Sequence, residues 1–339
     1  MKYGNFIIVL LIVALVLLMF VSCLIGVADI GIDEAWKALL SVFSGSKGSS
    51  QVSENTQYII FNLRLPRTLL AVLSGAGLSV CGVAFQAIFR NPLSDPYVLG
   101  VSSGASLGAA IAIITGLNGF IWGISGLSFL TALASVMLIV GISSIGNRLH
   151  TTTLLLAGIS LNFLIAAVVS LLMVLNHQSM DKIIFWTMGS LASATFENTG
   201  IVALFVVIGI GVTGLYAKDL NALLLGNQTA KTIGINVERT KRIILLVSTL
   251  MIAVIVSFTG VIGFVGLVVP HVVRLLVGAD NRRIIPYSLL GGMLFMLSAD
   301  VISRTVMPPS ELPIGSITSL IGSPVFIYLL FNAKKRLNR

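Results

Sequence analysis

Charged side chains are scarce in this sequence: Asp, Glu, Lys and Arg together make up only 10% of the 339 residues. An ordinary soluble domain is roughly a quarter charged. Because 56% of this chain is also hydrophobic, the composition excludes a soluble fold. A helix needs about 20 predominantly apolar residues to cross a bilayer. Several stretches contain no charged residue at all, namely 6–28, 68–89, 96–147, 149–180, 198–217, 243–273 and 312–333.

The longest of these stretches exceed one crossing. Glycine and asparagine at 116–123 interrupt the stretch 96–147, which predicts a turn between two spans. Glycines in 260–266 and Pro270 interrupt another, and a broken helix at membrane depth must be packed in protein or line a cavity. We therefore predict an all-α polytopic membrane protein, a single domain over 1–339 with about ten transmembrane helices. In the ninth helix, Asp300 and Arg304 are spaced for an i,i+4 ion pair.

Cysteine is nearly absent, and neither cysteine indicates a disulfide or a metal site. Cys23 and Cys81 lie inside apolar stretches, where cysteine usually serves as a small packing residue. The first stretch follows Lys2 and resembles a secretory signal peptide, with a near match to a lipoprotein cleavage box at 21–23. It is too long for that signal, so an uncleaved first span is expected.

Catalytic and nucleotide-binding motifs are missing as well. The chain contains no Gly-Lys pair and hence no phosphate-binding loop, so ATP hydrolysis would have to occur on a partner chain. His150, His177 and His271 are far apart and lack metal-ligand spacing. The sequence therefore predicts a transporter subunit without its own cofactor or metal, not an enzyme. An ion-coupled secondary transporter stays open as an alternative, although such proteins normally carry ionisable groups at mid-membrane.

The net charge of +9 reflects membrane topology rather than nucleic-acid binding. Cytoplasmic loops carry an excess of Lys and Arg, so the basic side of a ten-span arrangement is predicted to be cytoplasmic, with both termini there. Fifteen of the 21 basic residues fall on that side: Lys2, Arg90, Arg148, Lys218, Lys231, Arg239, Lys241, Arg242, Arg274, Arg282, Arg283, Lys334, Lys335, Arg336 and Arg339.

Three segments between the spans stand out. An external loop is expected at about 29–62, including a polar Ser/Gly stretch at 44–53. The segment 183–196 is too short to cross and is expected to be an external re-entrant or interfacial helix. On the cytoplasmic side, 218–242 is either an ordinary loop or two short helices lying along the membrane surface.

Charges at span ends are candidates for function. Arg64 and Arg67 flank Pro66 at the outer start of the second span, and Arg304 lies near the outer end of the ninth. These arginines could anchor helix ends at the lipid headgroups. Alternatively they could capture carboxylates, because a guanidinium binds a carboxylate in two-point fashion.

Several motifs in order along the chain resemble the FecCD family of type II ABC importer permeases, which includes permeases for iron-siderophores, haem and vitamin B12. The motifs are RLPRTL (64–69), RNPLSDP (90–96), LGVSSGA (99–105), LLLAG (154–158), the glycine loop 226–234, GFVGLVVPH (263–271), ELPIG (311–315) and GSPVF (322–326).

The resemblance implies a multi-pass permease in a bacterial cytoplasmic membrane that moves a metal chelate inward. It implies four kinds of partner: a second permease subunit, identical or homologous, two cytoplasmic ATPase subunits that hold ATP and Mg, an extracytoplasmic substrate-binding protein, and the chelate itself. In such permeases the arginines that match Arg64, Arg67 and Arg304 meet acidic residues of the binding protein.

The resemblance also assigns the inner segments. The ATPase-coupling helices match 221–236, and the position of the cytoplasmic gate matches Thr151 and Thr152, whose hydroxyls could equally cap the next helix. The expected coupling residues are Leu225, Gly226, Asn227, Thr229, Ala230, Lys231, Ile233 and Gly234.

Overall fold

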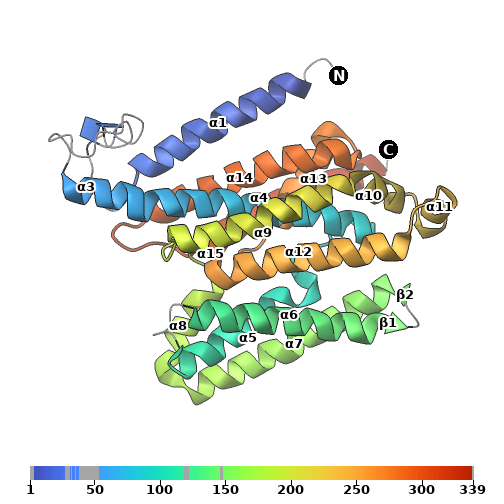
Figure 1. Cartoon of the computed structure of the whole chain (residues 1–339), viewed down its shortest axis with the longest axis horizontal. Helices are drawn as coiled ribbons and strands as arrows, with labels where there is room; N and C mark the ends of the chain where they lie inside the picture. The colour runs from blue at the N-terminus through green and yellow to red at the C-terminus, as the bar shows by residue number, and fades with distance from the viewer. Residues whose placement is uncertain are drawn as a thin grey trace.

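The computed structural model of the chain describes residues 4–26, 31, 33–34, 36–37, 53–117, 122–145 and 148–337. Within these residues the chain is almost entirely helical (Figure 1). The helices are α1 (Gly4–Leu24), α3 (Glu54–Tyr58), α4 (Leu65–Phe89), α5 (Val101–Ile114), α6 (Gly123–Ser143), α7 (Thr151–Leu175), α8 (His177–Thr187), α9 (Phe196–Leu215), α10 (Ala217–Leu224), α11 (Asn227–Thr232), α12 (Val237–Thr259), α13 (Val265–Val277), α14 (Asn281–Thr305) and α15 (Ile314–Leu337).

Four short elements lie between these helices. A π-helical turn, η1 (Ile59–Arg64), joins α3 to α4, and a 3-10 turn, η2 (Pro96–Leu99), precedes α5. The strands β1 (Ser144–Ile145) and β2 (Arg148–Leu149) form a small antiparallel hairpin between α6 and α7.

The prediction of an all-α membrane protein is confirmed. Seven helical stretches of the described chain are long and apolar enough to span a membrane: α1, the continuous α3–η1–α4, α6, α7, α9, α12 and α14. Shorter apolar helices occupy the places of the three remaining predicted spans, namely α5, α13 and α15. Together they account for about ten membrane helices.

The bundle has two ends with different character. Helices α10 and α11, the β1–β2 hairpin and the two marked chain ends lie toward one side in Figure 1, and α3 and α8 lie at the other. We call these the α11 end and the α3 end. Because consecutive spans run antiparallel, α4 starts at the α3 end whereas α14 finishes there.

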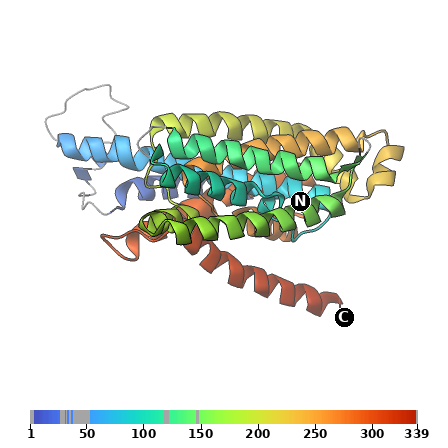
Figure 2. The ribbon, with the colours of Figure 1, turned by 90° about the horizontal axis from the view of Figure 1, so that it is seen from below.

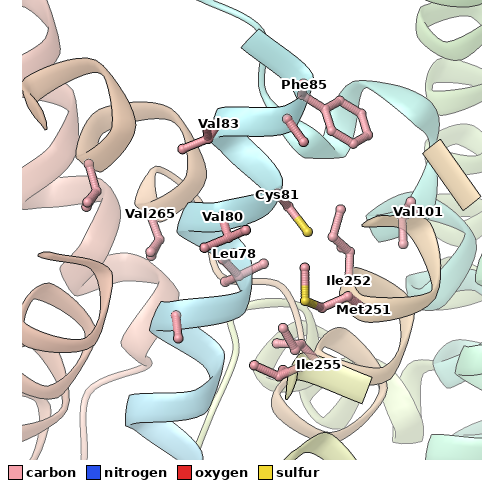
Figure 3. Packing of buried hydrophobic residues seen from close by; sticks show 14 of the residues in the cluster. Leu78, Val80, Cys81, Val83, Phe85, Val101, Met251, Ile252, Ile255 and Val265 are labelled. Atoms are coloured by element: carbon pink, nitrogen blue, oxygen red, sulfur yellow. The ribbon is translucent and has the colours of Figure 1, made fainter. Parts of the chain in front are cut away.

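Helix α4 is the centre of the core. Its side chains are almost all buried, and it packs against α14, α9, α13 and α12. Figure 3 shows Cys81 and Leu78 on α4 among Met251 and Ile255 of α12 and Val265 of α13. Cys81 and Cys23 are both buried and free.

Glycines let the backbones around α4 approach closely. A Cβ at Gly82 would overlap the backbone carbonyl of Gly266 on α13, and one at Gly75 would overlap that of Gly292 on α14. Lipid provides no hydrophobic driving force for helices to associate, so they are held together largely by van der Waals packing. Small residues at the crossings allow that packing because the backbones can approach closely.

Replacing Gly82 with leucine should therefore destabilise the fold by about 1–3 kcal/mol or more, because α4 and α13 must separate to admit the side chain. Thermal unfolding in detergent measures the effect. Gly211→Leu on α9 is the matched control, since a Cβ there meets nothing within 4 Å. Equal unfolding midpoints for the two variants would contradict this packing.

Three predicted boundaries need correction. The short helix expected at 183–196 is α8, His177–Thr187; it ends before Gly189, whose φ of +76° is a left-handed conformation that suits glycine. The expected external loop 29–62 lies largely outside the described residues, and its last part is helical because Ser53 caps α3. In the apolar stretch 243–273, the break falls at 260–264, while Pro270 lies within α13.

Two short helices do lie within the segment 218–242. They are α10 and α11, and the last residues of that segment already belong to α12. The alternative of an ordinary loop is therefore wrong.

Candidate docking and coupling sites at the two ends of the bundle

The three predicted docking arginines come together at the α3 end. Arg67 lies in the first turn of α4 and Arg304 in the last turn of α14, and both pair with Asp300. Arg67 Nε is 2.8 Å from Asp300 Oδ1, and Arg304 Nη2 is 2.9 Å from Asp300 Oδ2, which confirms the predicted i,i+4 pair. Arg67 Nη1 also donates to both carboxylate oxygens of Glu311 at 2.8 Å.

The last turn of α1 closes this cluster from the other side. Arg304 Nη1 donates to the carbonyls of Ser22 at 3.2 Å and Ile25 at 2.9 Å, and Nη2 donates to Ser22 Oγ at 2.8 Å. Arg64 donates to the carbonyl of Cys23 at 2.9 Å. A helix end leaves its last carbonyls without intrahelical partners and carries partial negative charge, so the two guanidiniums stabilise it.

The arginine side chains are therefore buried rather than presented to the outside. Arg64, Arg67 and Arg304 are 5%, 8% and 3% exposed, and Asp300 is 0% exposed. Neither lipid anchoring nor an open carboxylate trap describes this geometry. Arg67 and Arg304 share the carboxylate of Asp300, and Arg67 also pairs with that of Glu311. Glu311 is the most exposed of the side chains in these ion pairs, with 29% of its side chain accessible to solvent.

Glu311 is a site residue that the sequence did not single out. It lies in a quoted motif, but nothing in its spacing indicates a partner 244 residues away. Counting charges could have found Glu311. A buried arginine needs an acidic counter-charge, and Glu311 is the acidic residue that follows the ninth span in the sequence.

The predicted coupling residues surround α11 at the opposite end. Gly226 and Gly234 bracket the helix with φ of +111° and +89°, which reverse the chain sharply on both sides. Ala230 is 0% exposed and holds α11 against the bundle, whereas Leu225 and Ile233 are 69% and 59% exposed. Of the other predicted residues, Thr229 and Lys231 are exposed, and Asn227 is half-buried. The result is a projecting corner with two apolar side chains beside a lysine.

Hydrogen bonds tie this corner to the long helices. Asn221 on α10 donates through Nδ2 to Asp280 Oδ1 at 2.7 Å, and its Oδ1 accepts from the backbone N–H of Asn281 at 2.8 Å. Thr240 on α12 donates to Asp219 on α10 at 3.0 Å. The bonds from Asn221 and from the Arg282 N–H lower the pKa of Asp280. A lowered pKa means that these contacts stabilise at neutral pH and are lost only as the pH falls below the ordinary range of an aspartate.

Thr151 and Thr152, the gate candidates, are the first two residues of α7, directly after the β1–β2 hairpin. The N-cap of this helix is His150, and its side chain makes no capping hydrogen bond. The alternative that the threonine hydroxyls serve as the N-cap is therefore not supported. Thr151 is half-buried and Thr152 is exposed.

Between the two ends, the break between α12 and α13 is held by its neighbours. Tyr97 donates to the carbonyl of Ile262 at 3.0 Å, and Gln86 donates to that of Leu267 at 3.2 Å. Phe264 has a φ of +67°, an uncommon conformation for a residue with a side chain. Side chains of the bundle thus bond to the carbonyl of Ile262 in the break and to that of Leu267 in the first turn of α13, as expected where a broken helix is packed in protein.

No three His, Cys, Asp or Glu residues in the described part of the chain lie close enough together to hold a metal ion.

Comparison with known proteins agrees with this arrangement. The sequence profile of the FecCD transport family matches residues 13–332. The cobalamin import system permease protein BtuC of Halobacterium salinarum is 40% identical over 285 residues, which cover 84% of this chain and 76% of that protein. The hemin transport system permease protein HmuU of Yersinia pestis is 36% identical over 336 residues, covering 96% of this chain and 97% of that protein.

A solved structure described as an inward-facing conformation of a metal-chelate type ABC transporter aligns with a TM-score of 0.82 and 31% identity, over 97% of this chain and 99% of that chain. With its helical membrane fold and its family match over nearly the whole length, this chain belongs to the FecCD transport family and is a permease subunit of an ABC transporter rather than an enzyme.

Proposed function

We propose that this permease carries a metal chelate, a ferric siderophore, haem or cobalamin, inward across the bacterial cytoplasmic membrane. Separate ATPase subunits power it, and an extracytoplasmic binding protein delivers the chelate. The main observation in support is that one helix, α14, joins both candidate sites. At its start, Asn221 of α10 bonds to Asp280 and Asn281. At its end, Arg304 belongs to the arginine cluster. The 25 residues of α14 span about 37 Å, so a displacement at one end reaches the other.

Membership of an ABC permease family supports ATP hydrolysis on partner chains as the energy source and argues against an ion-coupled secondary transporter. The relatives named above import cobalamin and hemin, which supports a bulky metal chelate as the substrate class.

We place the α11 end in the cytoplasm. Exposed basic residues gather around it, including Lys218, Lys231 and Arg239, and the positive-inside rule then puts the termini on the same side. The ATPase subunits would bind the α11 corner through Leu225 and Ile233, with ATP and Mg held on those partners. Thr151 and Thr152 lie at this end of α7 and would close the pathway there.

The second permease subunit would cover apolar surface that the single chain leaves open. On α7, Phe163 and Leu164 are 74% and 61% exposed, and on α15, Leu320 and Tyr328 are 73% and 65% exposed. Figure 2 shows α15 leaving the bundle, so much of its surface has no partner within the described chain.

The buried arginine cluster changes how binding-protein docking would work. A carboxylate of the binding protein would take the place of Glu311 on Arg67, since Glu311 is the partly exposed partner of that guanidinium. Glu311→Gln should then strengthen binding of the loaded binding protein several-fold, measured with the permease in nanodiscs. Ser310→Ala, a neighbouring exposed change, is the control. Unchanged affinity for Glu311→Gln would remove Arg67 from the docking surface.

Reconstitution tests the proposal as a whole. In vesicles that contain the permease, its ATPase and its binding protein, chelate uptake should require ATP hydrolysis. Uptake by the permease without any ATPase would overturn the proposal. The chelate that copurifies with the binding protein identifies the substrate.

Asn221→Ala tests the mechanical link. It removes both contacts to the start of α14, so the ATPase should still bind while the number of ATP molecules hydrolysed per chelate rises several-fold. Each lost hydrogen bond costs about 0.5–1.5 kcal/mol, so the fold should persist. Asn198→Ala, at the opposite end of the bundle, is the matched control and should leave the number of ATP molecules hydrolysed per chelate unchanged. A normal coupling ratio for Asn221→Ala would show that the motion travels by another route.

A further inference from the structure

A groove on the outside of the bundle has no role in the transport cycle described above. It lies between α6 and α12, which run side by side in Figure 1, and its cavity volume is about 430 Å³. Pockets of about 300–1,000 Å³ hold small ligands. The floor is Val136, Leu245 and Thr249, all buried, and the rims are Met137 and Leu246, which are 67% and 58% exposed.

The end of the groove nearest the α11 end, which we call its mouth, carries a cation. Arg242 lines the groove on α12, and Gly141 lies opposite it near the end of α6. From Arg242 to Thr249 the groove follows seven residues of helix, about 10 Å. That length, starting in the first turns of α12, lies within one leaflet of a hydrocarbon core about 30 Å thick.

The first turns of α12 carry two exposed arginines near this mouth, Arg239 and Arg242, whereas Lys241 is buried and does not line the groove. Arg239 and Arg242 are both exposed and three residues apart, so they lie on the same face of the helix. A guanidinium has five N–H donors, so Arg242 can bind a phosphate while it keeps a contact within the protein.

The opposite end of the same helix pair provides a comparison. There the space between α6, α9 and α12 is only about 150 Å³ and has no charged residue in its wall. Trp122 and Phe258 pack edge to face across it with ring centroids 5.8 Å apart. Of these two spaces between α6 and α12, only the larger one, nearer the α11 end, has a cation in its lining.

We propose that this groove binds an anionic phospholipid, with the headgroup phosphate on Arg242 and one acyl chain between α6 and α12. Basic pockets between transmembrane helices on the cytoplasmic side are suited to anionic headgroups. The apolar walls distinguish a lipid from free phosphate, because only a lipid fills the channel beneath the arginine. Lipid binding at this groove requires that the protein is inserted in a membrane and that the side chains lining the groove are present. It does not require any particular transported chelate.

Gly141 makes the proposal testable without disturbing the core. A Cβ at this position meets nothing within 4 Å, so Gly141→Leu can place a side chain at the groove, and Arg242→Gln removes the charge at its mouth. Matched controls are Gly211→Leu, which also enters open space, and Lys218→Gln, which removes an exposed charge at the same end.

The experiment is native mass spectrometry of the full chain released from nanodiscs of phosphatidylcholine with and without phosphatidylglycerol. The unmodified protein and both controls should retain phosphatidylglycerol, and Gly141→Leu and Arg242→Gln should each retain it about tenfold less, as expected for losing about 1.4 kcal/mol of binding. Inorganic phosphate should not displace it. Equal retention by all variants, equal retention of phosphatidylcholine, displacement by phosphate, or a copurified protein helix in place of the lipid would each overturn the proposal.

Discussion

Asp300→Ala should be among the most destabilising single substitutions in this permease, by about 3–5 kcal/mol. Asp300 is 0% exposed and pairs with Arg67 and Arg304 at 2.8 and 2.9 Å, so its removal leaves two buried guanidiniums facing each other without that carboxylate. The cost arises from stranded buried charge rather than from the lost contact alone. The midpoint of thermal unfolding in detergent measures it.

Glu311→Gln is the matched control, because Glu311 pairs with the same Arg67 but is partly exposed to solvent. An exposed ion pair contributes roughly 0–1 kcal/mol, so this variant should unfold close to the unmodified protein. If both variants lost stability equally, the cluster would not be a buried network centred on Asp300. The comparison also shows why charge reversal of Arg67 cannot test docking cleanly, since that change disturbs the fold as well.

The second large effect is expected at the α11 corner. Leu225→Asp combined with Ile233→Asp should weaken binding of the ATPase subunits by about 100-fold, because two exposed apolar anchors become charged. Burying one such side chain is worth about 1.5–3 kcal/mol, and each 1.4 kcal/mol is a factor of ten. The measurement is the affinity of the purified ATPase for the permease in nanodiscs, together with ATP hydrolysis stimulated by the loaded binding protein.

Lys218→Asp is the control for charge, because it changes the net charge by the same two units on the exposed side of α10. Its affinity for the ATPase should stay within a few-fold of the unmodified value. An unchanged affinity for the Leu225 and Ile233 double variant would move the ATPase contact away from α11. A large loss for Lys218→Asp as well would show that charge, not apolar contact, dominates this interface.

The hydrophobic stretches and the charges between them were enough to predict the class of protein and the approximate number of spans, whereas 218–242 was left open between an ordinary loop and two short helices. These features depend on local properties: the length of chain that a bilayer covers, the hydrophobicity of each segment and glycine at chain reversals. The Asp300–Arg304 pair was predictable for the same reason, since helical spacing alone brings residues four apart together. The motifs then pointed to the family that the comparisons show.

Tertiary structure decided what those residues face. Arg67 and Asp300 are 233 residues apart, and Arg304 reaches Ser22 across 282 residues, so only the packing of α4, α14 and α1 brings them together. That packing turned three arginines expected at the outer surface into a buried cluster covered by Glu311. The groove beside Arg242 likewise exists only because α6 and α12 leave space between them. Sequence determines which groups are available along each helix, whereas the contacts between distant helices determine which of those groups remain free to meet a partner.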